Sequence, residues 1–238
     1  IQPMLDVRLF RNTVFTGAIT ANLISMMVDV GFIYFASQHL QLVSGLPPMY
    51  AGMLLIPGTL ATIIAGLVIA RVAVHFHPAQ VVSFGLALNA AAFAVLAFLG
   101  AHNDLVIILI FIVLGTGIGI AQTISNDLML SSVPPRKAGA ASAISETSYE
   151  MGAVLGTVII GGMLTAIYRA NVAIPAGLDE SLADNAHETL GGAVAVASQV
   201  GGEQANQLLS SAFAAFDSGV VVSSAFSAVL MGVMAVIS

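Results

Sequence analysis

The run "LVIILIFIVLGTGIGIAQTISNDLMLSSV", residues 105–133, is apolar almost throughout and contains one charged side chain, Asp127. An α-helix rises 1.5 Å per residue, so about 20 such residues cross the roughly 30 Å hydrocarbon core of a bilayer. Five further apolar runs of sufficient length occur at 12–43, 48–72, 78–101, 138–167 and 213–237. None alternates apolar and polar residues as the strands of a membrane β-barrel do. The sequence therefore predicts an all-α, polytopic transmembrane protein with six helices.

The composition leads to the same fold class. The chain is 58% hydrophobic and only 8% charged, whereas a soluble domain carries about 25% charged residues because its surface faces water. Turn-forming clusters separate the runs, such as "SGLPP" at 44–48 and "VPPRK" at 133–137. The first run is longer than a simple span, so we expect its start to lie in water or along the interface. Since the chain opens with Ile1, we expect it to be part of a longer protein.

The basic residues predict the orientation of the six spans. Only Arg169 falls on one side, and the other side carries Arg8, Arg11, Arg71, Arg136 and Lys137. Cytoplasmic loops are enriched in Lys and Arg, so we expect both ends of the chain to be cytoplasmic.

The long segment 170–212 then lies outside the cell. It contains five of the 12 acidic residues and no Lys or Arg, so much of the net charge of −6 belongs to this loop. We expect two short helices here, at 178–200 and 203–216, which turn at Gly201 and Gly202. A partly disordered loop is the alternative.

Three of the acidic residues inside predicted spans, Asp29, Glu146 and Glu150, are the candidate site residues. Glu146 and Glu150 are one helical turn apart in "SAISETSYEMGAVLG", residues 142–156, and Asp29 is central in the first run. Glu150 is about 21 Å along its helix from Arg136, so we expect it near mid-bilayer, at a depth similar to that of Asp29. Ionisable residues at that depth are costly and typical of functional sites, so the pattern indicates a water-accessible cavity that accepts cations or protons.

The alternative is that Asp29 and Glu150 are protonated within a packed bundle and do no chemistry. Glu146 is about 15 Å from Arg136 along the helix and is therefore closer to cytoplasmic water. Asp127 is only seven residues before Pro134, and we interpret it as a helix-end residue that reaches the interface.

Several residues near these acids are candidate contacts for a cation. Asn22, Ser25 and Asp29 share one helix face at i, i+3 and i+7, and Tyr149 precedes Glu150. The predicted binding surface is completed by Met26 and Phe32. Plain packing is the alternative for Met26, Phe32 and Tyr149, because such residues at helical spacing commonly fill a core.

The glycine-rich stretch "GTGIGI", residues 115–120, does not indicate a nucleotide site. It lacks the third glycine of the dinucleotide motif, and no strand precedes it. We predict instead that small residues allow another helix to approach closely, at Gly115, Gly117, Gly119, Gly152 and Gly156.

No motif predicts an enzyme or a metal site. His75 and His77 do not have the spacing of metal ligands, and no Ser/His/Asp or HExxH pattern occurs. We therefore expect no catalytic activity, no metal and no other cofactor.

Two stretches resemble the major facilitator superfamily, in its fourteen-helix drug:proton antiporter family and its quaternary-ammonium efflux branch. "QHLQLVSGLPPMYAGMLLIPGTLATIIAGLVIAR", residues 38–71, resembles the family signature at Gln38, Gln41, Gly45, Pro48, Ala51, Gly52, Pro57, Gly66 and Arg71. "VPPRKAGAASAISETSYEMGAVLGTVIIGGML", residues 133–164, is similar to the penultimate helix of that family. The charged Gly-x-x-x-Asp-Arg loop of the superfamily survives here only as Gly66 and Arg71. The resemblance covers nearly the whole chain.

This resemblance implies that residues 1–238 are the C-terminal six-helix bundle of a proton-coupled multidrug efflux protein in a bacterial plasma membrane. Its partners would be the lipid bilayer, the missing N-terminal bundle and lipophilic or quaternary cations, with no nucleic acid. The proton gradient would supply the energy, and Pro57 would be a structural residue of the second span.

Within that implied function, Glu150 would exchange protons, Glu146 would relay them, and Asp29 would attract the cation. Two other functions stay open, a carrier of another solute such as a metabolite or lipid, and a membrane scaffold that does not transport.

Overall fold

The structure, a computed structural model, describes residues 7–101 and 103–238, and these residues form helices and turns without strands. In this described part of the chain, six helices are long and apolar enough to cross a membrane. The prediction of an all-α, six-span fold is confirmed. The main helices are α1 (Thr13–Gln38), α2 (Pro48–Val72), α3 (Pro78–Leu99), α4 (Asp104–Ser131), α5 (Ala138–Leu155), α6 (Gly162–Asn171) and α9 (Gly202–Ile237).

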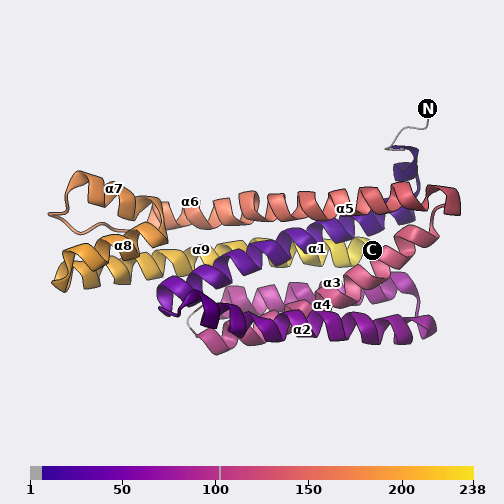
Figure 1. Ribbon diagram of the computed structural model, residues 1–238, viewed down its shortest axis with the longest axis horizontal. Coiled ribbons are helices and arrows are strands. Elements are labelled where there is room, and N and C mark those ends of the chain that lie inside the picture. The colour runs from indigo at the N-terminus through magenta and orange to yellow at the C-terminus, as the bar shows by residue number, and fades with distance from the viewer. Residues whose placement is uncertain (1–6, 102) are drawn as a thin grey trace.

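The long helices run alternately up and down, so the start of α1 and the end of α9 lie at one end of the bundle (Figure 1). We call this the terminal end. A pair of short helices, α7 (Glu180–Glu188) and α8 (Leu190–Val200), forms a hairpin at the opposite end, which we call the hairpin end.

Local chemistry explains where these helices start and stop. The Asn12 side chain caps α1 by accepting hydrogen bonds from the amides of Val14 and Phe15, and Asn103 caps α4 in the same way. Such caps satisfy amides that have no partner within the helix. Pro48 and Pro78 occupy the first turns of α2 and α3, where a missing N–H costs nothing.

Two helices contain π-helical turns. The first span ends in one at His39–Val43, and a second at Gly156–Gly161 joins α5 to α6 into one continuous rod. The fifth predicted span, 138–167, therefore extends to Asn171.

Aromatic residues fill the centre of the bundle. The Phe32 ring lies 4.8 Å from the Phe35 ring, 6.2 Å from that of Phe93 and 5.1 Å from that of Phe111, with the last pair stacked. All four side chains are buried. They join α1, α3 and α4 into one core.

The glycines of α4 lie where other backbones approach. A side chain at Gly115 would meet the carbonyl oxygen of Gly58, and one at Gly119 would meet that of Thr62, both on α2. Gly117 instead faces α3, where a side chain would overlap Asn89. The absence of side chains thus lets α4 fit against α2 and α3 at once.

A similar contact joins α5 to α1. A side chain at Gly152 would meet the carbonyl oxygen of Leu23, and one at Gly156 would meet that of Met27. Pro57, by contrast, lies inside α2 and is exposed.

The segment between the last two spans differs in part from the prediction. The expected helix 178–200 is divided at Thr189, whose hydroxyl accepts from the amide of Gly192 and caps α8. The turn at Gly201 and Gly202 is present, and both residues have positive φ, 64° and 62°. No breaker follows Gly202, so the expected helix 203–216 is the first part of α9.

The last span therefore begins at Gly202 rather than at Phe213. With 36 residues, α9 is about 54 Å long and exceeds the thickness of a bilayer core.

Two hydrogen bonds hold the hairpin against α6, the end of the rod that precedes it. The Tyr168 hydroxyl donates to the carbonyl of Ala186 at 2.8 Å, and Arg169 donates to that of Glu188 at 3.1 Å.

Candidate functional site

The two acids of α5 lie on an open face of the bundle. Gly152 and Gly156 contact α1, and Glu150, two residues before Gly152, is about 160° away around the helix. Glu146 and Glu150 are both exposed. Among residues 7–101 and 103–238, neither carboxylate has a hydrogen bond or ion pair. The alternative of a packed, protonated Glu150 stays a hypothesis for the full-length protein.

Asp29 is partly buried on α1, and its depth differs from the expectation. Gly31 of α1 packs against Ile160, and the two helices run in the same direction. Asp29, two residues before Gly31, is therefore level with the residue about two positions before Ile160. Glu150 is about two helical turns further back along the rod. Asp29 therefore lies roughly 10 Å nearer the hairpin end than Glu150, so the two acids differ in depth more than the expected similar depth implies.

The predicted cation-binding surface on α1 is only partly accessible. Met26 and Asp29 are partly exposed. Asn22, Ser25 and Phe32 are buried, with at most 1% of each residue exposed. These three residues belong to the interior of the bundle, because the faces of α1 that carry them pack against neighbouring helices.

A partly buried hydrogen-bond network joins α1, α4 and α5 next to the acids in the sequence. The amide oxygen of Asn126 accepts from Asn22 Nδ2 and from Ser145 Oγ, each at 3.2 Å. Its amide nitrogen donates to the Tyr149 hydroxyl at 2.6 Å. Two predicted site residues, Asn22 and Tyr149, thus meet at a third residue that the sequence reasoning missed. A polar residue within the apolar run 105–133 was the available signal.

Other buried polar atoms lie close to this network in the sequence. Among the described residues, the buried side-chain oxygens without a hydrogen-bond partner include Asn22 Oδ1, Ser25 Oγ and Ser125 Oγ. Buried polar atoms are nearly always paired. This part of the α1–α4 interface is therefore unusually polar for a membrane-spanning bundle.

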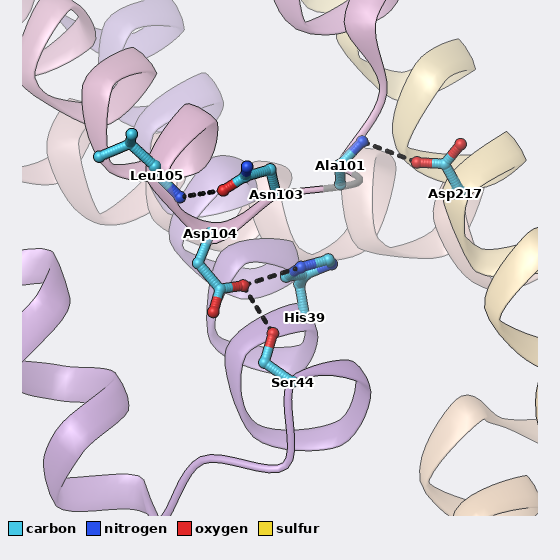
Figure 2. A network of polar contacts seen from close by, with 7 residues as sticks. All are labelled: His39, Ser44, Ala101, Asn103, Asp104, Leu105 and Asp217. Atoms are coloured by element: carbon cyan, nitrogen blue, oxygen red, sulfur yellow. Dashed lines mark hydrogen bonds and ion pairs between the residues drawn. The ribbon is translucent and has the colours of Figure 1, made fainter.

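A second polar cluster lies at the hairpin end (Figure 2). Asp104 Oδ1 accepts from Ser44 Oγ at 2.6 Å and lies 3.3 Å from His39 Nε2. Asp217 of α9 accepts from the amide of Ala101 at 2.7 Å. The cluster lines a cavity of about 860 Å³. It ties the end of the first span and the α3–α4 connection to α9.

The sequence pattern does not predict this cluster. Its members come from three separate segments, and only the fold brings them together. Asp127, which was interpreted as an interfacial residue, is exposed one turn before the end of α4.

Comparison with known proteins adds the family context. The family model of the Major Facilitator Superfamily matches residues 2–157. The multidrug efflux pump LfrA of Mycolicibacterium smegmatis is 47% identical over 231 residues, which cover 96% of this chain and 46% of LfrA. The methyl viologen resistance protein SmvA of Salmonella typhimurium is 31% identical over 237 residues, covering 97% of this chain and 47% of SmvA.

A more distant similarity links the chain to the tetracenomycin C resistance and export protein of Streptomyces glaucescens. The identity is 25% over 166 residues, or 69% of this chain and 31% of that protein. The chain spans about half the length of LfrA and SmvA.

Proposed function

The chain belongs to the major facilitator superfamily, and on that basis we propose that it is the C-terminal half of an exporter that exchanges lipophilic cations for protons. Within the superfamily we assign it to the fourteen-helix antiporter branch. The N-terminal half would cover the open face of α5, and the proton gradient would supply the energy. The terminal end of the bundle would face the cytoplasm.

The observation that carries this proposal is the pair of accessible acids, Glu146 and Glu150, on a membrane-spanning helix. A carboxyl group at that position is costly unless it binds protons, cations or water. Similarity to LfrA, a multidrug efflux pump, and to SmvA, a methyl viologen resistance protein, supports cationic drugs as the substrate class.

The mechanism follows from mutually exclusive binding. A cation bound near Asp29 favours the deprotonated carboxylate of Glu150, and a proton on Glu150 weakens the binding of that cation, so binding of one ligand releases the other. Glu150, deeper in the membrane, makes this exchange, and Glu146 passes the proton toward the terminal end. Asp29 provides a second negative charge nearer the hairpin end, with Met26 beside it.

The test is drug-induced proton release from the reconstituted full-length protein. Glu150→Gln keeps the shape of the side chain but cannot exchange a proton, so we expect the release to be lost at normal expression. Asp127→Asn is the matched control, because Asp127 is also exposed but lies near a helix end, and its variant should behave as the wild type.

Two results would contradict the proposal. Wild-type proton release by Glu150→Gln would remove this residue from the mechanism. Failure of lipophilic cations to release protons from the wild-type protein would instead favour a carrier of another solute or a scaffold.

A further inference from the structure

We propose that Asn126 is a positioning residue that couples cation binding on α1 to proton exchange on α5. The inference rests on the proposed function, because it assumes that α1 binds the cation and α5 carries the exchanging acids. It assigns a role to a residue that contacts neither ligand in the proposed mechanism.

Both the oxygen and the nitrogen of the Asn126 side-chain amide form hydrogen bonds to other helices. The oxygen accepts from Asn22 on α1 and from Ser145 on α5, and the nitrogen donates to Tyr149 on α5. A single planar group therefore fixes three side chains relative to one another. A shift of α1 against α5 must break or bend at least one of these hydrogen bonds.

On α5, each residue that is hydrogen-bonded to Asn126 is followed directly by an acid. Ser145 immediately precedes Glu146, and Tyr149 immediately precedes Glu150. The two bonds to Asn126 therefore set the rotation of the helical turn from which both carboxylates project. Loss of these bonds would leave the acids present but without the polar contacts that fix this turn of α5 to α4.

On α1, the network reaches Asn22, which is close in sequence to the proposed cation contacts. Asn22 is one helical turn before Met26 and two turns before Asp29. Asn22 is buried and cannot contact a cation from the open face. It can transmit a displacement of α1 to Asn126, and through Asn126 to Tyr149.

The charged and titratable groups around this part of α5 come from several elements. α1 contributes Asp29, α4 contributes Asp127, α5 itself carries Glu146, Tyr149 and Glu150, and the turn Pro135–Lys137 carries Arg136 and Lys137. Asn126 has no charge, so removing its side chain changes the coupling without changing the number of titrating groups.

The test measures how the affinity for a lipophilic cation depends on pH. We would use the full-length protein in detergent, with tetraphenylphosphonium as the ligand. If one proton leaves as one cation binds, the wild-type Kd changes by up to about tenfold per pH unit. Asn126→Ala should reduce this to about threefold or less while leaving the Kd at high pH within about threefold.

Two further variants separate positioning from general damage. Asn89→Ala is the matched control, since Asn89 is another buried asparagine, on α3, and it should keep the wild-type pH dependence. Tyr149→Phe removes one bond of the network and preserves the shape of the ring. The double variant with Asn126→Ala should show no less pH dependence than Asn126→Ala alone, because both changes remove the same bond.

Wild-type pH dependence in Asn126→Ala would overturn this inference and leave the proposed function intact. If Asn126→Ala does not fold, Tyr149→Phe decides the matter: a flattened pH dependence supports the inference, and an unchanged one overturns it. A wild-type Kd that does not respond to pH would instead remove the proposed function.

Discussion

Phe32 is close in sequence to Asp29, but its burial indicates a packing role rather than a substrate contact. Its ring is buried among Phe35, Phe93 and Phe111. Truncation of a buried Phe costs about 3–5 kcal/mol because it leaves a cavity. Phe32→Ala should therefore lower the unfolding free energy of the full-length protein in detergent by about that amount, as measured by denaturant titration.

The substrate preference of Phe32→Ala should not change. Met26→Ala is the comparison, because Met26 is only partly buried and its truncation should cost less. Normal stability together with an altered ratio of KM values for cationic and neutral drugs would show that Phe32 contacts the substrate after all.

The relation between two residues could be predicted where both lie on one helix and their spacing decides it. The acids Glu146 and Glu150 could be placed on one accessible face because spacing alone sets that relation. Asn126 could not be identified in the same way, since its partners Asn22 and Ser145 lie on two other helices. Burial of Asn22 likewise depends on which helix covers it.

At the scale of helices, backbone contact between α2 and α4 depends on the small residue Gly115. A methyl group there would meet the carbonyl oxygen of Gly58 and push the helices apart. We expect Gly115→Ala to destabilise the protein by about 1–3 kcal/mol, measured as a lowered melting temperature in detergent.

Gly52→Ala is the matched control on α2. No atom lies within 4 Å of the position that its new methyl group would occupy. Because Ala favours a helix over Gly by about 1 kcal/mol, this variant should be neutral or slightly stabilised. Equal melting temperatures for the two variants would argue against a tight α2–α4 contact.

Helices were predictable from hydropathy where an apolar run ended at a polar turn. The boundaries of α2 and α3 follow their prolines closely. The start of α9 was missed because residues 203–212 are more polar than a membrane span yet contain no helix breaker. Hydropathy identifies the part of a helix inside the membrane but does not predict the part that projects into water.

At the scale of the whole molecule, alternating helices separate most basic residues from the hairpin, and Arg169, which contacts it, is the exception. Arg71 is in the last turn of α2 and Lys137 in the turn before α5, and both of these segments lie at the terminal end, whereas Asp184 belongs to α7 of the hairpin (Figure 1). Single cysteines at Lys137 and Asp184, in protein with no other cysteine, should react with a membrane-impermeant maleimide from opposite sides of the membrane. The cysteine at Asp184 should label in intact cells, and that at Lys137 only after permeabilisation.

Cysteine at Arg136 provides a second position on the terminal side and should behave as the one at Lys137. Labelling of Lys137 and Asp184 positions from the same side would exclude an odd number of crossings between them. Labelling with the sides exchanged would reverse the proposed orientation.

The π-helical turn at Gly156–Gly161 has a consequence for the rotational phase of the long rod. Buried residues recur at every fourth position from Ser148 to Tyr168. In a regular α-helix such a repeat drifts by about 40° at each step, so that its far end would face a different neighbour from its near end. The extra residue of the π-helical turn sets the phase back by about 100°. Tyr168 is therefore still buried on the rod, four turns after Gly152, which packs on α1.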